Sequence, residues 1–230
     1  ANDMTANFLF SQTMPGSGAV DASSDGLQYR EVAAFSGCAV SEAGMHEASM
    51  GVACADFDCD SRPDIYLTHF YHQKNTLYHN RDNLTFVDDS RRFRVVTASL
   101  DYNGFGVVPL DFDQNGTMDL FIANGHVLGL KYTPNEMLPQ LLMNVDGKHF
   151  EDISAVSGNY FRQPNLGRGA AGIDFDNDGD PDVSISHVVR PVSLLRNDTV
   201  SQSRGVIGLL LEDHSRNSPV GGRVEIVCGD

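Results

Sequence analysis

The sequence predicts an all-β protein, an incomplete β-propeller in which four-stranded antiparallel sheets, or blades, stand side by side. Two observations predict this fold. First, one aspartate-rich loop pattern recurs along the 230-residue chain, at 56–64, 111–119 and 174–182. Second, each loop lies between short segments with the apolar and β-branched composition of strands. Repeats of this length with four strand signals each are typical of propellers.

The first strand of each repeat is a run of small and apolar residues with a glycine five residues before the loop. These glycines are Gly51, Gly106 and Gly169. We expect this strand to lie innermost, because only small and apolar residues fit near a crowded axis. The second strand follows each loop as an alternating segment, at 64–68, 119–123 and 182–186. All three loops should therefore lie at one end of the blades.

The third and fourth strands also repeat. Third strands are expected at 75–80, 140–144 and 193–197, and fourth strands with a central aromatic residue at 84–88 and 148–153. The N-terminal stretch has the same ending without a loop, since 7–10 resembles a third strand and 25–32 aligns with 146–153. Tyr29, Phe86 and Phe150 should then lie in blade cores. The predicted units are the end of a preceding blade with a linker at 1–48, repeats at 49–103, 104–166 and 167–203, and a C-terminal region at 204–230.

Each loop offers oxygen atoms at positions 1, 3, 5 and 9, and a further residue at position 7 completes the set. Hard oxygen ligands select Ca²⁺, and carboxylates this close repel one another without a cation. An EF-hand has a glutamate at position 12, where this chain has Leu67, Ile122 and Ile185. We therefore predict about three structural Ca²⁺ ions. The predicted ligands are Asp56, Asp58, Asp60, Arg62 and Asp64; Asp111, Asp113, Asn115, Thr117 and Asp119; and Asp174, Asp176, Asp178, Asp180 and Asp182.

The three sites should differ in strength. Ser61 stands where the other loops have glycine, and Pro63 precedes the last aspartate. Because that glycine permits a sharp turn, we expect the first site to be weaker or distorted. The third loop has the most carboxylates, so the site at Asp174 should bind most tightly.

Composition limits the function. The formal net charge of −15 argues against nucleic acid, which requires a basic face, and against an anionic membrane surface. No apolar run approaches the length of a membrane helix. Ala1 is not an initiator methionine, so we expect a removed leader or a fragment. The pairing of Cys38, Cys54, Cys59 and Cys228 stays open, with a Cys54–Cys59 disulfide and buried free thiols as the alternatives for that pair.

Catalysis is not predicted. The chain has eight histidines, but no spacing typical of a nucleophile and its base, so we expect them at the surface or at strand ends. Two classes of function remain: a calcium-stabilised binding or adhesion propeller, and a carbohydrate-binding or accessory module of a secreted carbohydrate-active enzyme. A glycan site needs exposed aromatic residues, for which Tyr132, Tyr160 and Phe161 are the candidates. They lie in inserts 125–138 and 156–166, which are predicted to be loops on one rim.

The segments Gly104-Phe105-Gly106-Val107 and Gly167-Arg168-Gly169-Ala170, each leading into an Asp-Phe-Asp loop, resemble the FG-GAP/VCBS repeats of integrin α-subunits. More closely, the chain resembles the cartilage acidic protein (ASPIC/UnbV) family, and 215–226 is similar to the start of that family's C-terminal domain. The resemblance implies Ca²⁺ in the blade loops and a secreted, periplasmic or cell-surface setting. It also implies a protein or glycan ligand, and further blades in a longer parent propeller.

Overall fold

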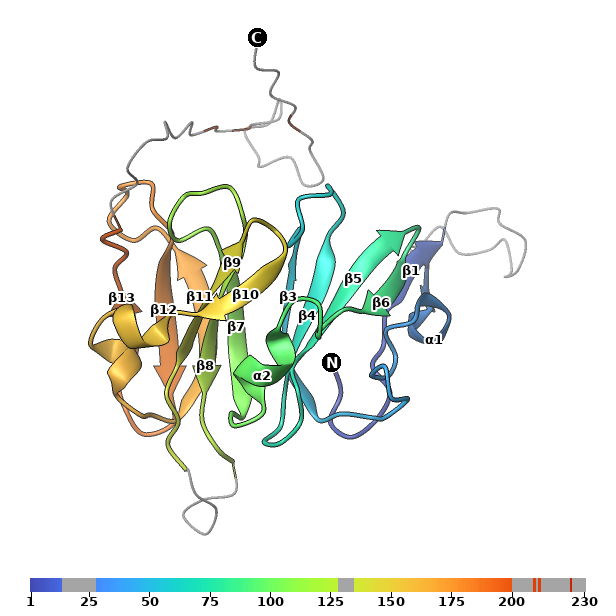
Figure 1. Cartoon of the computed structure of the whole chain (residues 1–230), viewed down its shortest axis with the longest axis horizontal. Helices are drawn as coiled ribbons and strands as arrows, with labels where there is room; N and C mark the ends of the chain where they lie inside the picture. The colour runs from blue at the N-terminus through green and yellow to red at the C-terminus, as the bar shows by residue number, and fades with distance from the viewer. Residues whose placement is uncertain (14–27, 128–134, 200–208, 210, 212–223, 225–230) are drawn as a thin grey trace.

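A computed structural model describes residues 1–13, 28–127 and 135–199, together with positions 209, 211 and 224. Three antiparallel sheets lie side by side, and a two-stranded sheet lies beside the first of them (Figure 1). No closed ring forms among the described residues, in agreement with an incomplete propeller. The predicted match at 25–27, half of the insert 125–138 including Tyr132, and nearly all of the C-terminal region lie outside the described residues.

The sheets are blades with the predicted strand order. Blade 1 contains β3 (Ser49–Ala55), β4 (Asp64–His69), β5 (Thr76–Asp82) and β6 (Thr85–Asp88). Blade 2 contains β7 (Gly104–Leu110), β8 (Asp119–Asn124), β9 (Gln140–Val145) and β10 (His149–Asp152). Blade 3 contains β11 (Gly167–Ile173), β12 (Asp182–His187) and β13 (Ser193–Leu195). In each blade the aspartate loop joins the first and second strands.

Short elements connect and flank the blades. The N-terminal sheet pairs β1 (Phe10–Thr13) with β2 (Gln28–Glu31), so the first strand begins where the predicted segment 7–10 ends. The described helices are α1 (Ala33–Ser36), α2 (Val95–Ser99), and the 3-10 turns η1 (Ser154–Val156) and η2 (Tyr160–Arg162). None of these helices in the described part of the chain is long and apolar enough to cross a membrane.

The inner strands of neighbouring blades touch through backbone atoms, as expected for the crowded axis. A Cβ atom on Gly51 would lie 1.9 Å from the carbonyl oxygen of Phe105 in blade 2. A Cβ atom on Gly106 would lie 2.4 Å from the backbone nitrogen of Ala170 in blade 3. No real side chain tolerates such approaches, so glycine at this repeat position sets the distance between blades.

Apolar side chains fill the space between blades. Between blades 1 and 2 the rings of Phe57 and Phe150 meet edge to face, with centroids 5.7 Å apart. Between blades 2 and 3 the rings of Phe121 and Phe161 do the same at 6.0 Å. Phe86 and Phe150 are buried, as predicted. Each blade therefore depends on its neighbours for burial, which is the basis of stability in repeat proteins.

Three details correct the expectations. Tyr29 is not in a blade core, because 59% of its surface is exposed on β2. The insert 156–166 is not simply a rim loop, since η2 turns Phe161 into the interface between blades 2 and 3, where it is 7% exposed. Cys54 and Cys59 are free thiols and form no disulfide; Cys38 is also free and is buried.

Candidate metal centres

Each loop folds so that its first, third and last aspartates meet. One ligand atom from each carboxylate lies within 4.8 Å of the others in all three loops. The last aspartate of each loop, at position 9, is fully or almost fully buried. The three groups are Asp56, Asp58 and Asp64; Asp111, Asp113 and Asp119; and Asp174, Asp176 and Asp182.

The aspartate at position 9 holds its loop against the third strand. In blade 1, Asp64 accepts hydrogen bonds from the backbone N–H of Phe57 at 3.1 Å and of Asn80 at 2.8 Å. Asp119 and Asp182 make the same two bonds in their blades. Because both carboxylate oxygens are used in this way, the position of this aspartate is fixed before any cation binds.

The aspartate at position 1 caps the turn of its own loop. Asp111 accepts from the backbone N–H groups of Asn115 and Gly116, both at 2.8 Å. Asp56 makes the equivalent bonds to Asp60 and Ser61, and Asp174 bonds the N–H of Gly179 at 3.2 Å. These Asx-type bonds explain locally why this sequence forms a compact loop between two strands.

The backbone of the first loop keeps the shape of the others despite its serine. The φ angle of Ser61 is 67°, close to the 90° and 93° of Gly116 and Gly179. Glycine adopts this left-handed region freely, whereas serine pays a conformational cost. The first loop is therefore strained at Ser61 but not distorted.

Positions 5 and 7 lie outside the three-carboxylate groups. Asp178 accepts the backbone N–H of Asp180 at 3.0 Å, and the side chain of Asp180 accepts a hydrogen bond from Gln114 of the neighbouring loop. In the second loop Asn115 accepts the Thr117 N–H at 2.7 Å. In the first loop the guanidinium of Arg62 pairs with Asp60, so only the backbone oxygen of Arg62 could serve as a ligand.

The buried carboxylates are electrostatically suited to a cation. Burial raises the pKa of Asp119 to about 7, and the nearby Asp113 and Asp111 add to this, while hydrogen bonds from Asn144 and Phe112 oppose it. Burial also raises the pKa of Asp64 and of Asp58. Carboxylates alone make up the three groups, a donor set that fits a hard divalent ion, and such an ion would offset the cost of burying them together.

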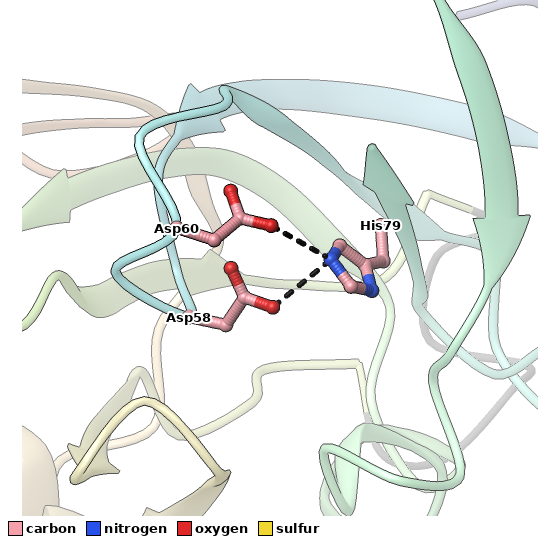
Figure 2. A group of neighbouring side chains, drawn as sticks. All are labelled: Asp58, Asp60 and His79. Atoms are coloured by element: carbon pink, nitrogen blue, oxygen red, sulfur yellow. Dashed lines mark hydrogen bonds and ion pairs between the residues drawn. The ribbon is translucent and has the colours of Figure 1, made fainter. Parts of the chain in front are cut away.

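Blade 1 adds a histidine that the sequence did not point to. His79, on β5, is 3% exposed, and its Nε2 atom lies 2.9 Å from Asp58 Oδ2 and 3.4 Å from Asp60 Oδ2 (Figure 2). Its Nδ1 atom lies 3.0 Å from Asp89 Oδ2. No signal in the sequence locates it, because His79 comes from the third strand and the aligned residues of the other blades are Met143 and Arg196.

The third-strand asparagines also join the loops to each other. The side-chain amide of Asn144 donates to the carbonyl of Phe57 in the previous blade at 2.8 Å. Asn197 donates to the carbonyl of Phe112 at 2.7 Å. The three loops therefore lie next to one another, as expected for sites at one end of the blades.

The remaining histidines and rim aromatics are mostly committed to structure. His69 ends β4 and His126 lies just after β8, as expected for strand-end positions, and both are buried. Burial lowers the pKa of His69 to about 4. Tyr160 is half-buried, and its hydroxyl lies 2.9 Å from Nε2 of His187. Phe161, another glycan-binding candidate, is buried and cannot offer an exposed ring to a glycan.

Comparison with known proteins agrees with this architecture. The model of the FG-GAP-like repeat family matches residues 56–122, which run from the first loop into the second strand of blade 2. Fold and loops thus define the chain as a segment of a β-propeller that contains an FG-GAP-like repeat. It is similar to Cartilage acidic protein 1 of Mus musculus, with 30% identity over 174 residues, 74% of this chain. The match covers 24% of the length of Cartilage acidic protein 1.

Proposed function

We propose that this chain is a calcium-binding, extracellular β-propeller segment that acts as a binding or adhesion module without chemistry of its own. One observation carries the proposal: three loops bring three carboxylates each within 4.8 Å, at the same repeat positions. The similarity to FG-GAP-like repeats and to Cartilage acidic protein 1 supports it. Calcium here has a structural role, because its ligands sit between paired strands.

The geometry explains how the ion would stabilise the blades. The carboxylates of each group converge from the two ends of a loop, and the last one is bonded to the third strand. A cation held by them ties three strands together and cancels repulsion between buried charges. Because the unfolded chain has no such arrangement, binding stabilises the folded state by mass action.

The ligand of the module is proposed to be a protein or a glycan that binds rim segments, because the calcium loops are committed to structure. The alternative, a carbohydrate-binding module of a larger enzyme, has less support. A glycan platform needs exposed aromatic faces. In η2, Phe161 packs into the interior, and the hydroxyl of Tyr160 is hydrogen-bonded to His187. We therefore favour a protein ligand.

Thermal melting tests the calcium proposal. Removing divalent ions with EDTA should lower the melting temperature, and millimolar Ca²⁺ should restore it. Affinities from 10⁻⁴ to 10⁻³ M are usual for extracellular calcium modules, so 1 mM Ca²⁺, about 1- to 10-fold above Kd, would add roughly 0.4–1.4 kcal/mol per site. Mg²⁺ at equal concentration serves as the control. Equal melting temperatures in EDTA and in Ca²⁺ would contradict the proposal.

A further inference from the structure

The surroundings of His79 make the first loop chemically different from the other two. Each predicted third strand ends in an asparagine, and these asparagines, Asn80, Asn144 and Asn197, align the three blades. The residues at the position of His79 in blades 2 and 3 are therefore Met143 and Arg196. Among the three loop-bearing blades, only blade 1 places an imidazole nitrogen against its loop. We propose that the loop of blade 1 binds a first-row transition-metal ion of the Zn²⁺ type through His79, Asp58 and Asp60.

The imidazole is aimed at the loop by a second carboxylate. The Oδ2 atom of Asp89 lies 3.0 Å from Nδ1 of the ring. The other ring nitrogen, Nε2, faces both loop aspartates (Figure 2). A carboxylate that accepts the Nδ1 proton fixes the ring and leaves Nε2 to coordinate, which is the usual outer shell of a histidine metal ligand. Asp89 is therefore a positioning residue for His79.

An unsatisfied atom inside the cluster also points to a missing cation. The side chain of Asp58 is 9% exposed, and its Oδ1 atom is buried without a hydrogen-bond partner among the described residues. Leaving a buried charged oxygen unpaired is costly. A metal ion chelated by both oxygens of Asp58, with Oδ2 on the side of His79, would satisfy this atom.

The donor set and its spacing fit zinc better than calcium. Ca²⁺ takes oxygen ligands, whereas imidazole with carboxylates suits Zn²⁺ and related ions. Ligands at about 2.0–2.2 Å from a tetrahedral ion lie about 3.3 Å from one another. The observed separations of 2.9 and 3.4 Å between Nε2 and the carboxylate oxygens are close to that value.

Two arginines compete with the metal for these carboxylates. Arg62 pairs with Asp60, and Arg92 lies 3.9 Å from Asp58 Oδ2 and 3.3 Å from Asp89 Oδ2. Their side chains are 39% and 46% exposed, so each can move into solvent when an ion enters. Exposed ion pairs contribute little, and a metal ion that binds through three protein ligands outweighs them.

The zinc proposal rests on the proposed function only in that the loop binds a cation. One titration distinguishes failure of the zinc proposal from failure of the calcium proposal. The EDTA-treated and dialysed 230-residue chain is saturated with Ca²⁺, and Zn²⁺ is then added in a calorimeter. We expect one further binding event, and Co²⁺ in place of Zn²⁺ should give the visible absorption of a tetrahedral site. No Zn²⁺ event would overturn the inference and leave the proposed calcium binding by the three loops intact. Absence of Ca²⁺ binding would leave the Zn²⁺ event measurable.

The blades themselves supply matched variants. His79→Met gives blade 1 the residue of blade 2, and it should remove the Zn²⁺ event while Ca²⁺ still binds. Met143→His, the reciprocal change, should leave the Zn²⁺ event of blade 1 in place. Asp89→Asn should weaken Zn²⁺ about 10- to 100-fold without abolishing it, which a purely structural role would not do. Unchanged Zn²⁺ affinity in both the His79 and Asp89 variants would show that Zn²⁺ binds elsewhere, and would refute the site.

Discussion

The aspartate at position 9 of each loop combines a structural role with a metal-binding role, and substitution separates them. Asp119→Ala leaves the buried N–H groups of Phe112 and Asn144 without their acceptor. The calcium-free protein should lose about 2–4 kcal/mol of unfolding free energy, since each unsatisfied buried group costs roughly 1–3 kcal/mol. Urea unfolding in EDTA measures this.

Asp113→Ala is the matched control at position 3. Its carboxylate bonds only Asn115 of its own loop, so calcium-free stability should fall by less than about 1 kcal/mol. Calcium affinity should fall clearly, as calorimetry would show. If both variants lower calcium-free stability equally, the separation of roles is wrong.

A buried histidine makes stability depend on pH. His69 lies against the hydroxyls of Ser49 and Thr76 at 3.3 and 3.1 Å. Burial and, less strongly, the nearby Lys74 lower its pKa to about 4 against the opposing effect of Asp88. In the unfolded chain the same histidine has a pKa of about 6.5. As the pH falls, it is therefore protonated in the unfolded chain before it is protonated in the folded protein. Stability should fall as pH drops from about 6.5 to about 4, by about 3 kcal/mol in total.

His69→Gln, which keeps hydrogen-bonding capacity toward the two hydroxyls, should flatten the pH dependence of the melting temperature in that window. His72→Gln, at an exposed neighbouring position, should leave it unchanged. A His69→Gln protein with the same acid sensitivity as the parent would assign the effect to the carboxylates instead.

At the level of single residues, the loop aspartates were predictable and His79 was not. Positions 1, 3 and 9 repeat in the sequence, and the structure brings them together. His79 comes from a different strand, and whether its ring faces the loop depends on the pleat and pairing of β5. A spacing pattern along one segment contains no information about that contact.

At the level of elements, glycine at the inner strand controls how blades pack. Gly106→Ala would place a Cβ atom 2.4 Å from the backbone of Ala170. Blades 2 and 3 would have to separate, so we expect the free energy of unfolding to fall. Overpacking typically costs about 1–3 kcal/mol, and we expect a value at or above the upper end because the clash is with backbone. Chemical unfolding of the purified variant measures the loss.

Gly169→Ala is the control at the same repeat position in blade 3. There the added Cβ would meet only the hydroxyl of Ser186, at 2.9 Å, and a side chain can move more easily than backbone. We expect a clearly smaller loss of stability than for Gly106→Ala. Equal losses would mean that the local strand conformation, rather than contact between blades, requires glycine here.

Strands with a clear apolar alternation were predicted to within one or two residues, as for β8 and β12. The short elements were not. α2 begins at Val95, after Arg94 in a left-handed conformation, and it packs its apolar side into the interface of blades 1 and 2. Its five residues are too few for a helical period to stand out, so tertiary packing, rather than local propensity, determines it.

For the whole molecule, the face of blade 3 turned away from blade 2 has no covering blade among the described residues. The face of blade 3 that corresponds to the buried faces of blades 1 and 2 contains Ile173, Phe175 and Leu194, which are 46%, 39% and 56% exposed. In blade 1 the side chains equivalent to Phe175 and Leu194, Phe57 and Leu77, are fully buried. Such an open side follows from an incomplete propeller, because a four-stranded sheet cannot bury both faces alone.

We therefore predict that the 230-residue chain associates in solution through the open face of blade 3. Contiguous exposed apolar surface promotes association, and the negative net charge of −15 opposes it, so self-association should strengthen as salt screens the repulsion. Light scattering over a range of protein and salt concentrations detects this. Leu194→Lys should shift the chain toward monomer, because a charge in the centre of the face must be desolvated on contact. Val156→Lys, at an 80% exposed position outside that face, should not. A calcium-loaded monomer at all concentrations would show that three blades suffice without a partner surface.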